Sequence, residues 1–151
     1  MSMVNDAALN QSGDDDWFFP KVDAGLTPFG SRVLVQIRSV REKSNGGIIL
    51  TQSSKDTEHD NTQVAIVVAV GPLAYKNRNT MEAWPEGAWC NPGDFVYVPR
   101  YGGSRFERKL SKPIESAKYG KVEKVQFAIF DDLNFLGKVD DPHSIPAYLG
   151  Q

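Results

Sequence analysis

The stretch that organises this chain is Ser44-Asn45-Gly46-Gly47-Ile48-Ile49-Leu50-Thr51. It places three aliphatic residues in a segment, residues 38–61, whose only other strongly apolar side chain is Val40. Residues 52–62 contain no side chain of the kind that forms a core. A long polar segment that displays aliphatic side chains needs a physical reason, because exposed apolar surface tends to associate.

Two structures fit this stretch. Asn45-Gly46 favours the positive-φ turn of a β-hairpin, with Ile48 to Leu50 as the returning strand. Alternatively, the segment is a docking loop that stays disordered until Ile48, Ile49 and Leu50 enter a hydrophobic groove on a partner. The two hypotheses differ in whether these three side chains lie in the core of their own chain.

Length and composition favour one all-β domain with extensions. The chain has 151 residues, of which 40% are hydrophobic, enough to bury one core. Thirteen glycines, nine prolines and several short β-branched runs are typical of an all-β fold.

Charge and cysteine content narrow the class of protein. A net charge of −2 gives no electrostatic case for nucleic acid as the principal partner. A single Cys90 excludes an intramolecular disulfide and suits a reducing cytosol. No signal-peptide pattern occurs, and no apolar run approaches the ~18 residues of a membrane helix. We therefore expect a cytoplasmic protein without a membrane partner.

The N-terminal region changes character abruptly. Residues 1–16 are polar and predicted to be disordered, and Trp17-Phe18-Phe19-Pro20 follows directly. Because three adjacent aromatic rings are costly to leave in water, we expect them to pack on the exterior of the fold or on a neighbouring subunit. A direct role in holding unfolded protein is the alternative.

Hydrophobic periodicity predicts the strands. In the first strand, 31–38, Val33, Val35 and Ile37 share one face and polar residues mostly occupy the other. The β-branched run 64–70 predicts a strand buried on much of both faces, which ends at Gly71-Pro72. Further strands are predicted at 95–98 and 125–130, with residues 133–139 closing the core. We expect the first and the C-terminal strands to be the unprotected edges of the sheet, which neighbouring subunits would pair.

Connections between these strands are also predictable. Residues 73–91 form an excursion with a turn at 77–79, and Asn91-Pro92-Gly93-Asp94 returns the chain tightly to the sheet. Residues 100–124 carry eight basic and three acidic side chains, which is typical of a solvated hairpin.

Catalytic and metal sites find little support. Neither His59 nor His143 has a recognisable nucleophile or orienting-acid pattern around it, and Cys90 lacks a catalytic signature. The acidic run 56–60 fails as a calcium loop, because Asn61 stands at the glycine position and Val67 at the glutamate position. We expect no enzyme activity, no metal and no cofactor, and no glycine-rich phosphate loop occurs.

In their order, these elements resemble the GroES-type co-chaperonins. The motifs are Gly46-Gly47-Ile48-Ile49-Leu50-Thr51, Ala69-Val70-Gly71, Gly93-Asp94-Phe95-Val96 and an aromatic-glycine turn at Tyr101. The resemblance implies an N-terminal extension (1–25), a GroES-like, partly open β-barrel (26–139) and a C-terminal tail (140–151). Within the barrel it implies a mobile loop at about 39–62 and a roof hairpin at about 72–91. Lengthened members of this family occur in bacterial viruses, and a viral origin fits the extensions here.

The resemblance also implies function. Gly46, Gly47, Ile48, Ile49 and Leu50 match the residues with which the family's mobile loop contacts a GroEL-type chaperonin, and Tyr101 matches an aromatic that faces the dome cavity. It implies a heptameric ring that encloses an unfolded client protein, with ATP bound by the partner chaperonin. The alternative is an SH3-like or OB-like β-barrel that binds nucleic acid or peptide as a monomer, with salt-sensitive binding through residues 100–124.

Overall fold

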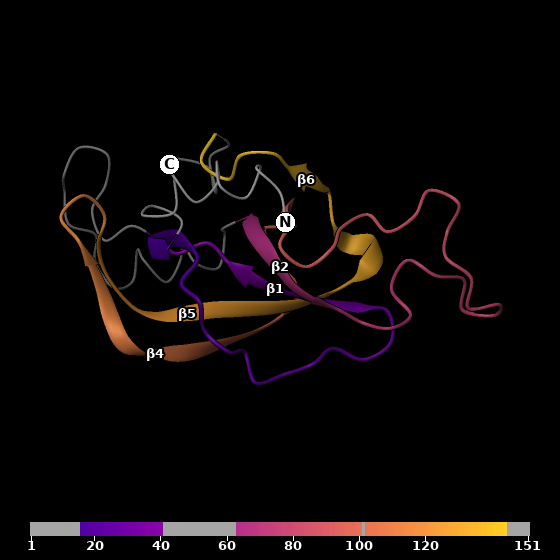
Figure 1. The fold of residues 1–151 in the computed structure, drawn as a ribbon, viewed down its shortest axis with the longest axis horizontal. Helices are drawn as coiled ribbons and strands as arrows, with labels where there is room; N and C mark the ends of the chain where they lie inside the picture. Colours follow the sequence, from indigo (N-terminus) through magenta and orange to yellow (C-terminus); the bar gives the residue numbers. More distant parts are fainter. Residues whose placement is uncertain (1–15, 41–62, 101, 145–151) are drawn as a thin grey trace, which may run out of the picture.

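A computed structural model describes residues 16–40, 63–100 and 102–144 (Figure 1). The described residues form one antiparallel six-stranded sheet with the strand order β4-β5-β1-β2-β3-β6. Its elements are β1 (Arg32–Ile37), β2 (Val64–Val70), β3 (Phe95–Tyr97), β4 (Ser104–Ser116), β5 (Gly120–Asp131), the 3-10 helix η1 (Asp132–Asn134) and β6 (Gly137–Val139). The predicted all-β fold is confirmed, and the sheet is open between β4 and β6.

The first strand lies in the middle of the sheet and not at its edge, so that prediction was wrong. β1 pairs with β2 on one side and with β5 on the other, and β4 and β6 are the two edges. A six-residue strand with alternating side chains looks the same locally whether one or both of its neighbours are present. Only the long-range pairing with β5, about a hundred residues later, distinguishes the two cases.

The inner face of the sheet carries the main core. Val33, Val35 and Ile37 of β1 point to this face, as predicted, and are fully buried. Val67 of β2 and Phe130 of β5 join them. A register shift between Leu34 and Val35 marks a β-bulge against β2, which increases the local twist and helps an open sheet to curl.

The outer face is covered as well, which sequence periodicity did not predict. Gln36 is only 5% exposed, and its amide Nε2 donates to the carbonyl of Pro20 at 2.7 Å. Leu34 packs with Ala24 and Phe127. The covering segment is residues 17–24, which we call the N-terminal strap and which crosses the sheet as an indigo trace (Figure 1).

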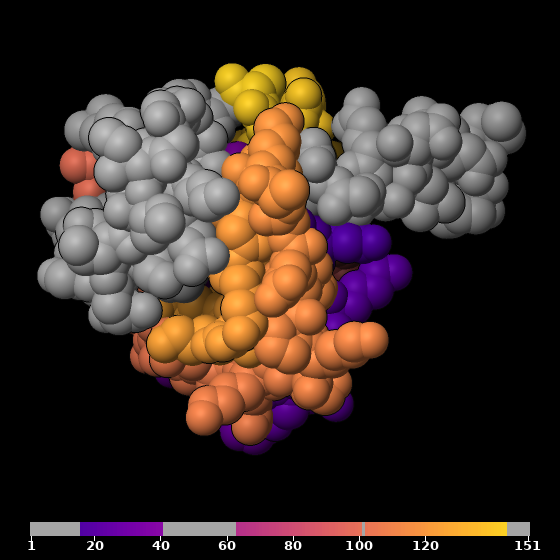
Figure 2. Space-filling view, turned by 90° about the vertical axis from the view of Figure 1, so that its left-hand side faces the viewer, coloured from indigo at the N-terminus to yellow at the C-terminus, as the bar shows by residue number. Residues whose placement is uncertain are grey.

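The β4–β5 hairpin is longer than predicted. β5 starts at Gly120, while its pairing with β1 covers only Phe127 to Asp131, so the first half of β5 extends beyond β1 with β4 as its partner. Most of its charged side chains are exposed, and Lys124 pairs with Glu107 at 3.2 Å and Lys121 with Glu123 at 3.0 Å. The expected solvated hairpin is confirmed for these charged side chains but not for Tyr119 and Val122, which are buried. The hairpin runs up the middle of the face shown in Figure 2.

The described start of the C-terminal tail is packed against the fold. Pro142 is buried, and the ring of His143 lies 5.1 Å from that of Phe18. The Asp141 side chain accepts a hydrogen bond from the His143 amide at 2.9 Å, which closes a turn. Residues 141–144, the described start of the predicted tail, therefore pack against the folded unit.

Candidate functional site

The site residues predicted from the sequence lie outside the described part of the chain. Gly46, Gly47, Ile48, Ile49 and Leu50 fall within residues 41–62, and Tyr101 is the single omitted residue between β3 and β4. Their roles stay predictions. The structure does describe the points at which the segment 41–62 leaves and re-enters the fold.

These two points are adjacent. The amide of Arg38, just after β1, donates to the carbonyl of Val64 at the start of β2, at 3.1 Å. Ser39 and Val40 are 6% and 8% exposed. The chain therefore leaves the fold and re-enters it at one end of the β1–β2 pair, which is compatible with both hypotheses for residues 44–51.

Phe18 of the N-terminal strap holds the first end. Its carbonyl accepts a hydrogen bond from the Ser39 amide at 2.8 Å. The guanidinium carbon of Arg38 lies 4.3 Å from the centre of the Phe18 ring. At this distance the cation is attracted to the face of the ring.

Gln63 holds the second end. Its carbonyl accepts from the Val98 amide at 2.7 Å, and its side-chain Nε2 donates to the Val98 carbonyl at 3.2 Å. The hydroxyl of Tyr97 donates to Gln63 Oε1 at 3.1 Å. Because Gln63 is 9% exposed, these bonds satisfy a buried amide that would otherwise be costly.

An aromatic cluster supports both ends. Trp17 and Phe18 are each 2% exposed, and Tyr119 near the tip of the β4–β5 hairpin packs on them with ring centroids 5.1 and 4.7 Å away. The indole Nε1 of Trp17 donates to the Gly120 carbonyl at 3.0 Å. Val64 belongs to the same cluster. The predicted packing of Trp17 to Pro20 on the exterior of the fold is confirmed.

Sequence reasoning missed the hairpin side of this cluster. Tyr119 stands in a strongly basic stretch that reads as solvated surface, and the only local signal was an aromatic residue before Gly120. Its burial depends on a contact with Trp17, which is far away in the sequence.

The predicted roof hairpin is a short excursion with an ordered turn. Its arms meet at a bridge between Lys76 and Ala83. At the predicted turn the Asn77 side chain accepts hydrogen bonds from the amides of Asn79 at 2.8 Å and Thr80 at 3.1 Å. It extends away from the sheet at the end opposite the β4–β5 turn (Figure 1).

Tyr75 ties the base of this excursion into the core. It is 1% exposed, and its amide donates to Asp132 Oδ2 of η1 at 2.9 Å. Its φ of 60° is rare for a residue with a side chain. Tyr75 also packs edge-on against Trp84.

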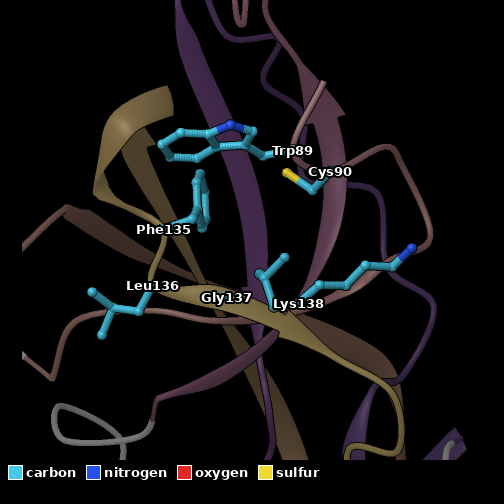
Figure 3. Close-up of a pocket in the computed structure, with 7 residues that line it drawn as sticks. Trp89, Cys90, Phe135, Leu136, Gly137 and Lys138 are labelled. Atoms are coloured by element: carbon cyan, nitrogen blue, oxygen red, sulfur yellow. The ribbon is translucent and has the colours of Figure 1, made fainter. Parts of the chain in front are cut away.

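A pocket of about 360 Å³ lies between the end of the excursion and β6. Its lining includes Trp89, Cys90, Phe135 and Lys138. Figure 3 shows the Trp89 and Phe135 rings facing each other, whereas the Leu136 side chain points away from them. Leu136 is 63% exposed, so this edge of the sheet presents apolar surface.

The groups around Cys90 do not activate it. Burial raises the pKa of the thiol, and the hydrogen bond with Tyr75, whose hydroxyl is 3.4 Å from Sγ, only partly opposes this. Burial, followed by the interaction with Cys90, also raises the pKa of Tyr75. A thiol with a raised pKa is neutral near pH 7 and is a poor nucleophile.

Across residues 16–40, 63–100 and 102–144, no group of three or more His, Cys, Asp or Glu side chains is arranged to hold a metal ion. In the same ranges there is no helix of the length and apolarity needed to span a bilayer.

Comparisons with known proteins agree with this architecture. The family model described as "Chaperonin 10 Kd subunit" matches residues 25–119, more than half of the chain. The co-chaperonin GroES of Tetragenococcus halophilus is 35% identical over 79 residues, which are 52% of this chain and 76% of that protein. The co-chaperonin GroES of Lactobacillus helveticus is 35% identical over 87 residues, 58% of this chain and 84% of that protein.

A more distant relative is a longer protein. The chloroplastic 20 kDa chaperonin of Arabidopsis thaliana is 27% identical over 84 residues, 56% of this chain and 30% of that protein. The family match starts just after the N-terminal strap and ends at the tip of the β4–β5 hairpin. From fold and family match together, the chain belongs to the chaperonin 10 kDa subunit family, that of the GroES-type co-chaperonins.

Proposed function

We propose that this chain is the lid subunit of a GroEL-type chaperonin. Copies of it form a ring, most simply the heptamer of the family, that docks on the chaperonin and encloses an unfolded client protein during ATP-dependent folding. The observation that carries the proposal is the hydrogen-bonded pair of ends at Arg38 and Val64, because the family's docking motif, Gly46-Gly47-Ile48-Ile49-Leu50, lies between them in the sequence.

The aliphatic triplet supplies the contact with the partner. Burying Ile48, Ile49 and Leu50 yields roughly 5 to 8 kcal/mol gross. Ordering about ten loop residues at ~1 kcal/mol or more each offsets most of this gain. One loop therefore binds weakly, whereas several loops on one ring bind tightly through their high effective concentration.

Ring formation is supported by the edges of the sheet. β6 is a three-residue edge strand, and the apolar side chains of Leu133 in η1 and Leu136 just before β6 are 64% and 63% exposed. Different surfaces that meet head to tail close into a ring when the rotation is right. We assign ring contacts to this region.

The remaining parts of the proposal follow from the ring. Tyr101 would face the enclosed cavity, and ATP would bind to the chaperonin, so the lid itself needs no cofactor. We place the protein in the cytoplasm of a bacterium, or of a bacterial host if the chain is viral. Neither nucleic acid nor a membrane is a proposed partner, and the comparisons do not favour an SH3-like or OB-like binding module.

Substitution in the triplet tests this function. Leu50→Ser or Ile49→Ser is expected to leave the ring and its melting temperature nearly unchanged, while affinity for a nucleotide-loaded GroEL-type chaperonin falls by about a hundredfold or more, because a small loss in each loop is repeated around the ring. Binding to immobilised chaperonin measures the affinity, and calorimetry measures the melting temperature. If either substitution unfolded the protein, the side chains would lie in the core and the hairpin hypothesis for residues 44–51 would be correct.

A further inference from the structure

The N-terminal strap and the tip of the β4–β5 hairpin form one structure beneath the ends of the 41–62 segment. The Trp17 indole is hydrogen-bonded to Gly120, and the Tyr119 ring packs on both Trp17 and Phe18. The strap starts before residue 25 and the tip reaches residue 120, so both lie at or beyond the limits of the family match. The two parts thus meet although they are far apart in the sequence.

This structure contacts both ends of the segment. At the first end, Phe18 accepts the Ser39 amide hydrogen bond and stacks beneath the Arg38 guanidinium. At the second end, Val64 belongs to the same hydrophobic cluster as Trp17 and Phe18. Tyr97, whose hydroxyl donates to Gln63, packs against that cluster.

The strap is also fixed independently of the segment. The Pro20 carbonyl accepts from Gln36 Nε2 at 2.7 Å on β1, and the Ala24 carbonyl accepts from Arg108 Nε at 3.0 Å on β4. Phe19 packs on Phe95 of β3 with ring centroids 5.3 Å apart. Because the strap is anchored to β1, β4 and β3, it can hold the residues that it contacts, such as Ser39, in a fixed position.

We propose that the strap and the hairpin tip position the two ends of the 41–62 segment and thereby set the affinity of the docking loop for the chaperonin. Phe18 and Tyr119 are its positioning residues: Phe18 contacts the first end directly, and Tyr119 acts by holding Phe18. The proposal rests on the proposed function and extends it to the N-terminal strap, which precedes the family match, and to the hairpin tip, where the match ends. Fixed ends lower the entropy lost when the loop docks, and they aim every loop of the ring at its partner site together.

The test uses the full-length protein and three leucine variants. Phe18→Leu and Tyr119→Leu remove the ring but keep a large apolar side chain, so they are expected to fold. Phe106→Leu is the matched control, because Phe106 is an outer-face ring of the same hairpin that stacks on Phe127 at 5.4 Å and belongs to a different cluster. Two quantities are measured: hydrogen exchange of the Ser39 amide in the free protein, and affinity for the nucleotide-loaded chaperonin well below the melting temperature.

In Phe18→Leu and Tyr119→Leu, Ser39 exchange is expected to rise by about tenfold or more while amides of central β1 stay protected. Affinity is expected to fall by about tenfold or more, since each loop's loss is repeated around the ring. Phe106→Leu should change neither quantity. The inference is overturned if the wild type binds and Phe18→Leu binds equally well, or if Phe106→Leu has the same effect. A wild type that binds no chaperonin would overturn the proposed function, and Ser39 exchange would then report on the positioning alone.

Discussion

At the residue scale, Gly71 lies just after β2, in close contact with the backbone of Gly30 and Arg32. Its amide donates to the Arg32 carbonyl at 2.8 Å, and a Cβ at this position would lie 2.3 Å from the Gly30 carbonyl oxygen. Backbone atoms cannot yield as a flexible side chain can. Gly71→Ala is therefore expected to destabilise the protein by about 1–3 kcal/mol, as overpacking does.

Urea denaturation measures this loss. Gly137→Ala is the control, because a Cβ there meets nothing within 4 Å and the backbone needs no positive φ. Equal midpoints for Gly71→Ala and the wild type would show that the end of β2 does not lie against residue 30.

The raised pKa values of Cys90 and Tyr75 predict that the protein loses stability at alkaline pH. Both have a pKa in the folded protein above the ordinary values of 9.0 and 10.0, so both stay neutral while the unfolded chain ionises. The unfolded state then binds fewer protons, and stability falls as pH rises, by at most ~1.4 kcal/mol per pH unit for each group. Below about pH 8 neither group contributes a slope.

Urea unfolding between about pH 7.5 and about pH 10.5 checks this, with Cys90→Ala as the comparison. The wild type is expected to lose stability more steeply above pH 9 than Cys90→Ala, which retains only the Tyr75 contribution. Parallel curves for the two proteins would show that the Cys90 thiol is as free to ionise in the folded state as in the unfolded state.

Local chemistry made some of these residues predictable. The stop at Gly71-Pro72 and the turn at residues 91–94 follow from glycine and proline alone, and the Asp94 amide indeed bonds to the Asn91 carbonyl at 3.0 Å. The burial of Tyr75 could not be predicted from the sequence. It accompanies a hydrogen bond from the Tyr75 amide to Asp132, which is distant in sequence.

At the element scale, we expect the packing of the N-terminal strap to stabilise the folded protein. Trp17→Ala removes a ring that is 2% exposed and its hydrogen bond to Gly120. The expected loss is up to about 3–5 kcal/mol, limited by the free energy with which the strap docks. Thermal unfolding and amide exchange through residues 16–20 measure it. An unchanged melting temperature together with unprotected amides there would mean that the strap is a free tail.

Strands were predictable where their side chains alternate between apolar and polar, as in β1, or form a continuous β-branched run, as in β2. β2 matches its predicted range of 64–70 because a β-branched run has few alternatives. The first half of β5 was missed because its lysines and glutamate hide the pattern, although Val122 is buried beneath the strap. The place of β1 in the middle of the sheet depends on which strand pairs with it, and periodicity carries no such information.

At the scale of the whole molecule, the order of weak motifs identified the family better than any single motif. The family match over residues 25–119 confirms the GroES-type assignment, while the two parts outside it, the strap and the far side of the hairpin, could be assigned no role from the sequence. Their contact with each other is a property of the folded chain alone.

The basic charge of the β4–β5 hairpin allows a test that distinguishes a co-chaperonin lid from a module that binds nucleic acid. Ion pairs such as Lys124 with Glu107 neutralise part of its basic charge. The lid account expects no strong binding to a single-stranded oligonucleotide at physiological salt, as measured by fluorescence anisotropy. Tight binding that weakens steeply with salt would instead favour the nucleic-acid module.

Sedimentation velocity of the purified chain, alone and with a GroEL-type chaperonin plus nucleotide, tests the central claim most directly. Alone, the chain is expected to sediment as a ring of several subunits at micromolar concentration. With chaperonin, it is expected to move at the chaperonin's rate when nucleotide is present and to separate from it when nucleotide is removed, since the partner's nucleotide state controls every docking site together. A monomer that never moves with the chaperonin in either condition would contradict the account.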